Sequence, residues 1–147
     1  MDLTDHVWSE LRLGGRWVHA DTGELTVDKP LLYESGWGKR LTYCFAVRAR
    51  EAVDVTRRYT RHWAEVAARR DLCSEEWLEG HLAELRARLE RGLAPEEAAR
   101  LHAEQEAELR ELREMEGSER APRSQEQQGR ITGDAAWHEA RGENTGN

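Results

Sequence analysis

A histidine and an aspartate near the start of the sequence are the side chains best placed for acid–base chemistry. His6 and Asp21 flank a Gly14-Gly15 pair, which is typical of a tight turn between antiparallel strands. A two-residue turn at Leu13-Gly14 would place His6 opposite Asp21, and one at Gly14-Gly15 would place Trp8 there. In either register His6 and Asp21 share a face, because side chains alternate along a strand. A carboxylate that orients an imidazole is part of a nucleophilic triad, although most such cross-strand pairs are plain polar contacts.

A triad also needs a nucleophile, and the chain has two cysteines. Cys44 lies in an apolar run, where a thiol is normally an inert part of the core. Cys73 follows Arg69-Arg70, which favour the thiolate, but has acidic residues on both sides, which disfavour it. We therefore expect neither thiol to be the nucleophile. Two cysteines also make neither a disulfide framework nor a zinc site, so we expect a reducing compartment, the cytosol or the nucleus.

The composition indicates a chain with only a partial apolar core. Its 147 residues include 22 Lys and Arg against 29 Asp and Glu, a net charge of −7, and 35% are charged against 38% hydrophobic. An ordinary domain has about 25% charged and 45–50% apolar residues. Only Trp137 among the aromatic residues follows Trp77. We expect a core in the first half, then solvated helices, then a tail.

The same composition excludes several classes of protein. There is no run of about 18 apolar residues, so no membrane-spanning helix is expected. Residues 1–5 have neither the basic nor the apolar region of a secretory signal. The acidic balance and the lack of a long Lys/Arg patch argue against non-specific nucleic-acid binding.

The first half of the sequence predicts strands. Residues 6–11 and 16–20 are rich in β-branched and aromatic residues and form the expected hairpin. Residues 36–39, Gly-Trp-Gly-Lys, are interpreted as a structural turn, because they lack the spacing of a phosphate loop. Residues 41–47 are apolar at nearly every position, which predicts a central strand, and residues 53–56 predict a further short one.

From about residue 60 the pattern predicts helices. Trp63, Val66 and Ala67 have helical spacing, and Ser74 is a typical N-cap for a second helix that ends at Gly92. Pro95 opens a third helix that runs to residue 117. The second and third helices are expected to form a hairpin. Its many Glu and Arg residues indicate a solvated face, and a partner surface is the alternative, because its leucine stripes need a cover. Residues 117–128 are polar and predict disorder.

Three motifs resemble those of one enzyme family. Residues 5–10 read Asp-His-Val-Trp-Ser-Glu, residues 16–21 read Arg-Trp-Val-His-Ala-Asp, and residues 28–39 read Asp-Lys-Pro-Leu-Leu-Tyr-Glu-Ser-Gly-Trp-Gly-Lys. They resemble the cytoplasmic peptide:N-glycanases of the transglutaminase-like superfamily. The resemblance extends through residues 53–70 and returns at residues 129–137, Gly-Arg-Ile-Thr-Gly-Asp-Ala-Ala-Trp.

The resemblance implies a fold and a domain organisation. The expected class is α+β: the antiparallel sheet half of a transglutaminase-like, or papain-like, core, followed by a helical hairpin and a partly disordered tail. Residues 1–70 would be the C-terminal part of the catalytic core, residues 71–116 the hairpin, and residues 117–147 a polar linker with a family-like C-terminal segment.

The resemblance also implies roles for individual residues. His6 corresponds to the family's catalytic histidine and Asp21 to its orienting aspartate, while Trp8 and His19 become candidates for the glycan cleft, with core packing as the alternative. In the family a cysteine attacks the amide that joins an N-glycan to asparagine. That cysteine and the family's zinc-binding cysteines lie upstream of the first motif, so we expect neither the nucleophile nor a metal or other cofactor in this chain, and the chain alone is expected to be inactive.

The implied function is hydrolysis of the glycan–asparagine amide of misfolded N-glycoproteins in the cytoplasm. A ubiquitin-receptor shuttle protein or another proteasome-linked factor would be a further partner, and no membrane or nucleic-acid partner is expected. The alternative is a non-catalytic transglutaminase-like module that docks such a shuttle or a DNA-repair partner. The His6 and Asp21 pair favours the enzyme lineage.

Overall fold

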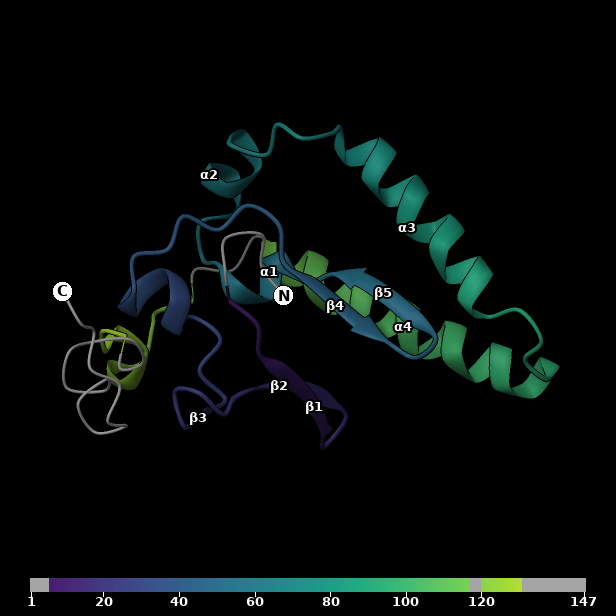
Figure 1. Cartoon of the computed structure of the whole chain (residues 1–147), viewed down its shortest axis with the longest axis horizontal. Coiled ribbons are helices and arrows are strands. Elements are labelled where there is room, and N and C mark those ends of the chain that lie inside the picture. The colour runs from purple at the N-terminus through teal and green to yellow at the C-terminus, as the bar shows by residue number, and fades with distance from the viewer. Residues whose placement is uncertain (1–5, 117–119, 131–147) are drawn as a thin grey trace, which may run out of the picture. The chain divides into compact units, whose positions relative to one another are not determined.

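A computed structural model describes residues 6–116 and 120–130 of the chain (Figure 1). It confirms the expected α+β class. The chain divides into two compact units. Of the described residues, we call Val7–Lys39 with residues 122–130 the sheet unit, and His6 with residues 40–116 and 120–121 the helical unit. The domain boundaries expected at residues 70 and 116 stay a prediction. Among the helices of the described residues, none is long and apolar enough to cross a membrane.

Three antiparallel strands in the order β1-β2-β3 begin the sheet unit, namely β1 Ser9–Leu13, β2 Arg16–Asp21 and β3 Thr26–Val27. Ser9 pairs with Ala20 and Leu13 with Arg16, so the turn is formed by Gly14 and Gly15, whose φ angles of +58° and +84° suit glycine. This is the second of the two registers that the sequence left open.

The first strand is shorter at its start than the sequence predicted. β1 begins at Ser9 rather than at residue 6, so His6 lies outside the strand pairing. The reason is that the backbone after Asp21 bends into a turn: Asp21 Oδ1 accepts hydrogen bonds from the N–H groups of Gly23 and Glu24, at 2.9 and 3.1 Å. The turn offers no straight strand with which residues 6–8 could pair.

A five-residue π-helix, η1 Leu32–Gly36, lies against a short 3₁₀-helix, η2 Ser124–Gln127. The N–H of Leu31 donates to Glu126 Oε1 at 3.0 Å, and the Glu126 side chain is buried. A Cβ on Gly36 would lie 2.2 Å from the carbonyl oxygen of Gln128, so only glycine fits there. The prediction of disorder over residues 117–128 is therefore wrong for residues 124–127, because distant partners order this polar segment.

The helical unit begins with a two-stranded antiparallel sheet, β4 Phe45–Arg48 and β5 Glu51–Asp54. The central strand predicted over residues 41–47 is therefore wrong for residues 41–44, which lie outside β4. Two of their backbone carbonyls are bonded by side chains instead: Arg69 donates to the Leu41 carbonyl at 2.8 Å and Arg70 to the Thr42 carbonyl at 3.0 Å. The Cys44 carbonyl alone of these four residues keeps a strand-like bond, from the Val55 N–H at 2.8 Å. The run is apolar because it is buried: Tyr43 packs on Ala52 of β5 as well as on Leu78 and Leu82, which belong to a later helix.

Four helices follow, α1 Thr56–Tyr59, α2 Trp63–Ala68, α3 Glu75–Leu89 and α4 Pro95–Glu116. The predicted cap of α3 is confirmed, since Ser74 Oγ accepts from the Trp77 N–H at 3.2 Å. Pro95 is the first residue of α4, as expected, and Gly92 has a φ of +83° in the connection.

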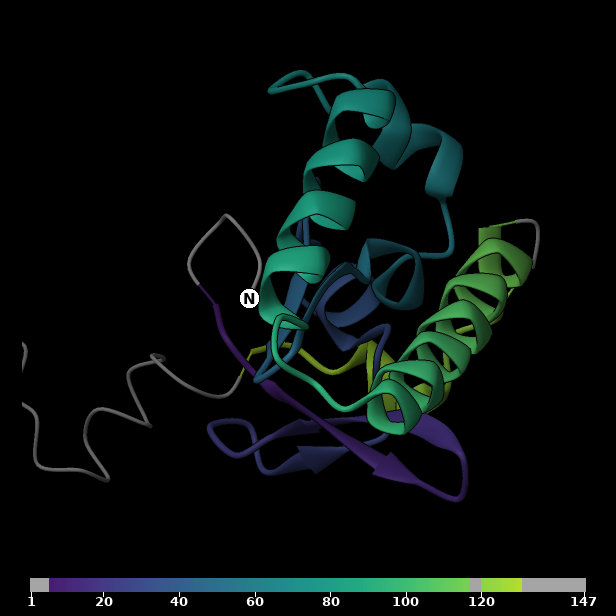
Figure 2. The same cartoon turned by 90° about the vertical axis from the view of Figure 1, so that its right-hand side faces the viewer.

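α3 and α4 are the two helices of the predicted hairpin and are joined by a short connection, but they do not pack along each other. The two helices contact each other near their connection, where Glu90 accepts from Gln105 and pairs with His102, and they then diverge into a V (Figures 1 and 2). α3 packs on β5 and α4 packs on α1. A cavity of about 180 Å³ lies between the arms of the V. Leu78 and Leu82 of α3 and Leu109 and Leu112 of α4 line this cavity from its two sides.

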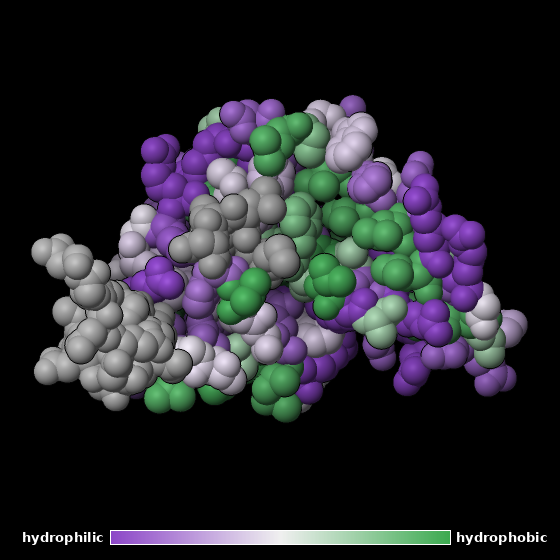
Figure 3. Space-filling model, viewed as in Figure 1, coloured by the Kyte–Doolittle hydropathy of each residue, from purple (hydrophilic) through white to green (hydrophobic). Residues whose placement is uncertain are grey.

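The core of the helical unit lies between α3 and the β4–β5 hairpin, where Figure 3 shows apolar side chains gathered. It is formed by Tyr43, Ala52, Leu78 and Leu82, with Phe45, Cys73 and Leu85 packed against them. The core of the first half and the Leu78 and Leu82 face of the second predicted helix are both present.

Candidate functional site

Asp21 is a buried acidic residue of the sheet unit, and its carboxylate accepts hydrogen bonds from three donors. Oδ1 accepts from the backbone of Gly23 and Glu24, and Oδ2 accepts from the hydroxyl of Tyr33 at 2.9 Å. Asp21 is 3% exposed. A buried carboxylate with donors on both oxygens has a fixed orientation, which is what an orienting group needs.

The Tyr33 hydroxyl joins Asp21 to His19. Tyr33 comes from η1 and is fully buried, and its hydroxyl lies 2.6 Å from His19 Nε2. His19 and Asp21 are two residues apart on β2, so their side chains are on the same face of the sheet. The hydroxyl therefore bridges two neighbours of one strand face.

His19 is held as a neutral imidazole. Its Nδ1 accepts from the backbone N–H of Lys29 at 3.3 Å, so the ring proton is on Nε2 and points at Tyr33. Burial lowers the pKa of His19 to about 4, and the nearby carboxylates of Asp21 and Glu10 oppose this without outweighing it. Both ring nitrogens thus make hydrogen bonds within the sheet unit, which agrees with core packing, the alternative to a place in the glycan cleft.

Trp8 covers the same cluster. Its ring stacks on the Tyr33 ring with the centroids 4.2 Å apart, and Trp37 meets Tyr33 edge-on at 5.0 Å. The structure thus brings together three of the four residues that the sequence singled out, namely Trp8, His19 and Asp21. The assignment of Trp8 and His19 to a glycan cleft stays a prediction.

His6 is half-buried and precedes β1, and the strand register does not fix the position of its side chain relative to Asp21. Its role as the proton carrier stays a prediction.

Two residues that support the site, Tyr33 and Glu126, were not predicted from the sequence. Tyr33 lies inside the Asp28–Lys39 motif, which was the available signal for it, whereas nothing local to Glu126 indicates its burial.

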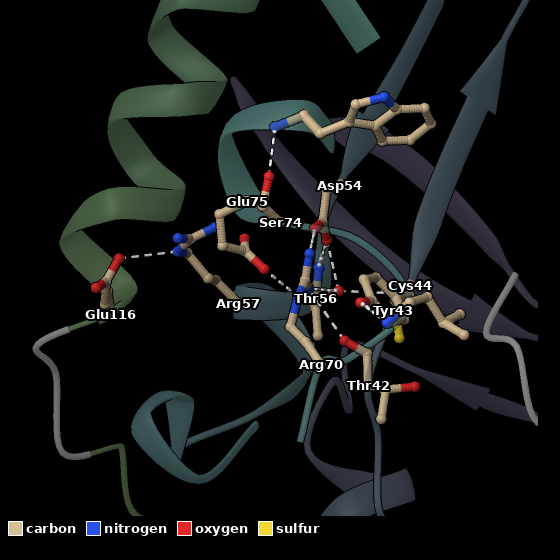
Figure 4. Close-up of polar contacts among 12 residues, drawn as sticks. Thr42, Tyr43, Cys44, Asp54, Thr56, Arg57, Arg70, Ser74, Glu75 and Glu116 are labelled. Carbon is tan, nitrogen blue, oxygen red and sulfur yellow. Dashed lines mark hydrogen bonds and ion pairs between the residues drawn. The ribbon is translucent and has the colours of Figure 1, made fainter. Parts of the chain in front are cut away.

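Both cysteines of the chain lie in the helical unit. Cys44 is fully buried, as expected, and its backbone N–H donates to Thr56 Oγ1 at 2.7 Å. Figure 4 shows it beside a junction held by Arg70, which also pairs with Asp54 and Glu75. Cys73 is half-buried against the apolar core of the helical unit. Neither forms a disulfide.

The neutral state of His19 predicts a loss of stability in acid. Its pKa is about 4 when folded and 6.5 unfolded, so the unfolded chain binds the extra proton between these values, and stability is full above pH 6.5 and falls as the pH approaches 4. At 1.36 kcal/mol per unit, the loss is about 3 kcal/mol. Urea unfolding of the chain at pH 7 and pH 4.5 measures it.

Other groups titrate in the same range, so the control is the His19→Gln variant, which cannot take up this proton. Its free energy of unfolding should fall less between pH 7 and pH 4.5, by about 2–3 kcal/mol. Equal falls in the two proteins would contradict the assignment of His19 as buried and neutral.

Comparison with known proteins finds several that are similar to this chain in sequence. No protein-family model matches it. It is 40% identical to a peptide-N(4)-(N-acetyl-beta-glucosaminyl)asparagine amidase of Arabidopsis thaliana, 41% to that of Mus musculus and 41% to that of Homo sapiens. Each alignment covers 97% of this chain but only 20%, 22% and 21% of the relative.

These identities confirm the resemblance expected from the three motifs. The chain spans about a fifth of the length of the curated relatives that it matches. Nearly the whole of this chain is thus homologous to one segment of the peptide-N(4)-(N-acetyl-beta-glucosaminyl)asparagine amidases, the enzymes also called peptide:N-glycanases.

Proposed function

We propose that this chain supplies the proton-transfer half of a peptide:N-glycanase active site. In this proposal His6 carries the proton and Asp21 orients His6, while the attacking cysteine comes from outside these 147 residues. The substrate is the amide that links an N-glycan to asparagine in misfolded glycoproteins of the cytosol. The observation that carries the proposal is the Asp21 carboxylate, which accepts hydrogen bonds from three donors, in a chain that is 40% identical to the Arabidopsis thaliana amidase.

The proposed reaction is amide hydrolysis through a thioester. The thiolate attacks the amide carbon, and the C–N bond breaks as the imidazolium of His6 gives its proton to the leaving glycosylamine. His6 then takes a proton from water, whose oxygen attacks the thioester carbon, and the thiol leaves with that proton. Asn becomes Asp, and the glycosylamine is released. Asp21 stabilises the imidazolium that is present in both steps.

Within this chain, the positions of the two cysteines support a divided active site. Cys44 is fully buried in the helical unit, and Cys73 is partly buried against its apolar core, which disfavours both thiols as nucleophiles for a bulky glycopeptide. We therefore propose that the chain by itself releases no glycan.

The test replaces the aligned segment of the Mus musculus amidase with this chain and assays glycan release from a denatured high-mannose glycoprotein. We expect the hybrid to be active and the 147-residue chain alone to be inactive. An inactive but folded hybrid would favour the alternative, a non-catalytic binding module. Activity of the chain alone that disappears with Cys44→Ser or Cys73→Ser would contradict the divided site.

A further inference from the structure

We infer that Tyr33 is the positioning residue for Asp21, and that His19 fixes the Tyr33 hydroxyl so that its proton points to the carboxylate. This inference rests on the proposed function, because it deepens the role of Asp21. In this inference His19 does not line the glycan cleft. It is a neutral residue that holds Tyr33, and it is two hydrogen bonds away from Asp21, the partner of His6.

The direction of each hydrogen bond follows from the donors available. The Lys29 N–H can only donate, so His19 Nδ1 accepts, and the proton of the neutral ring is on Nε2. That N–H donates to the Tyr33 oxygen, which leaves the single phenolic proton for Asp21 Oδ2. The hydrogen bonds therefore run one way, from imidazole through phenol to carboxylate.

The Tyr33 ring is held so firmly that the hydroxyl has one position. The residue is fully buried, and aromatic rings contact it from three sides: Trp8 stacked, and His19 and Trp37 edge-on. Its backbone belongs to η1, a π-helix, which is a rare element often found at functional sites. A phenol fixed in this way holds the carboxylate at little cost in conformational entropy.

The η1 helix is itself anchored from the far end of the chain. Glu126 accepts the Leu31 N–H, just before η1, and the Gly36 backbone lies directly against the Gln128 carbonyl at its end. Both anchors come from residues 122–128, which lie nearly 100 residues downstream. The orientation of Asp21 thus depends on a segment that the strand hairpin alone would not contain.

Tyr33→Phe removes only the hydroxyl and keeps the buried ring. Asp21 Oδ1 retains its two backbone donors, while Oδ2 loses the hydrogen bond from the Tyr33 hydroxyl, so the carboxylate is held less firmly. In the hybrid enzyme we expect kcat to fall about tenfold or more, the effect of one hydrogen bond to a charged group, and KM to change less than about twofold. Tyr43→Phe is the matched control: it removes a hydroxyl that accepts from the Leu72 N–H in the helical unit, and kcat should stay within about twofold.

A pair of substitutions at His19 separates support from packing. His19→Gln keeps an N–H donor that reaches Tyr33, whereas His19→Met keeps the volume and loses the donor. We expect His19→Gln to retain most of the activity and His19→Met to match Tyr33→Phe. Equal loss in both, or an unchanged kcat in Tyr33→Phe, would overturn the inference.

A spectroscopic readout tests the same chain of bonds without any activity. In the ¹⁵N-histidine-labelled chain, one imidazole should stay neutral with its proton on Nε2 from pH 8 down to about pH 5, and it is assigned to His19 by its absence in His19→Gln. Tyr33→Phe should remove the protection of that ring proton from exchange with water. Titration of His19 near pH 6.5, or a proton on Nδ1, would overturn the inference, whether or not the hybrid is active. An inactive hybrid whose chain gives the expected spectrum would overturn only the proposed function.

Discussion

Replacing His6 by alanine in the active hybrid should lower the rate of glycan release about 10⁴-fold or more. His6 is proposed to move the proton in both steps of the reaction, so no step proceeds normally without it. Asp21→Asn should cost about 10⁴-fold, because the amide cannot stabilise the imidazolium and favours the wrong tautomer. Steady-state kinetics on a fluorescent glycopeptide would measure both losses.

The double variant distinguishes a working pair from two separate contributions. Residues that act as a unit are not additive, so His6→Ala with Asp21→Asn should be no slower than His6→Ala alone. His102→Ala is the matched control, since His102 is an exposed histidine of α4 in the helical unit. Retention of a tenth of the activity by His6→Ala would contradict the proposed role.

The hairpin and the helix starts could be predicted from sequence because their signals are local. Gly14 and Gly15 adopt the positive φ angles that their turn requires. At the helix starts, Ser74 accepts a hydrogen bond from an otherwise unpaired N–H, and Pro95 has no N–H to leave unpaired. In each case the deciding contacts lie within a few residues along the chain.

The strand expected over residues 41–47 shows what an apolar pattern cannot decide. Apolar residues on both faces indicate burial, but not which element does the burying. Here Arg69 and Arg70, nearly 30 residues downstream, donate to the backbone carbonyls that a neighbouring strand would otherwise have bonded. The two arginines carry no sequence signal that distinguishes them from cations placed at a helix end.

The candidate site also has one part that could be predicted from the sequence and another that could not. Period-two alternation places His19 and Asp21 on one face of β2, which the sequence supports directly. The bridge through Tyr33 and the anchor at Glu126 could not be predicted, because each depends on segments brought together by the whole sheet unit. A polar composition around residue 126 indicates disorder unless its distant partners are known.

Removing the charge of Glu108 should destabilise the chain by about 3–5 kcal/mol, the cost of breaking a buried ion pair from one side. Glu108 lies on α4 with its side chain 2% exposed, and it accepts from Arg58 at 2.8 Å and from both terminal nitrogens of Arg48 at 2.8 and 2.9 Å. These bonds connect α4 to α1 and β4. Glu108→Gln keeps the size of the side chain but leaves two arginines, one of them almost fully buried, without their shared counter-charge.

Glu106→Gln is the control, because Glu106 is an exposed carboxylate on the same helix, and it should change the free energy of unfolding by less than about 0.5 kcal/mol. Acid should reproduce part of the effect. Burial alone would raise the pKa of Glu108, but the hydrogen bonds from Arg48 and Arg58 outweigh it and hold that pKa below its ordinary value. The stabilisation is therefore present at neutral pH and is lost as the pH falls through the lowered pKa. Urea unfolding of the three proteins at pH 7 decides the question: a Glu108→Gln variant within 1 kcal/mol of the unchanged chain would show that α4 is held by its apolar contacts, with the ion pairs adding nothing.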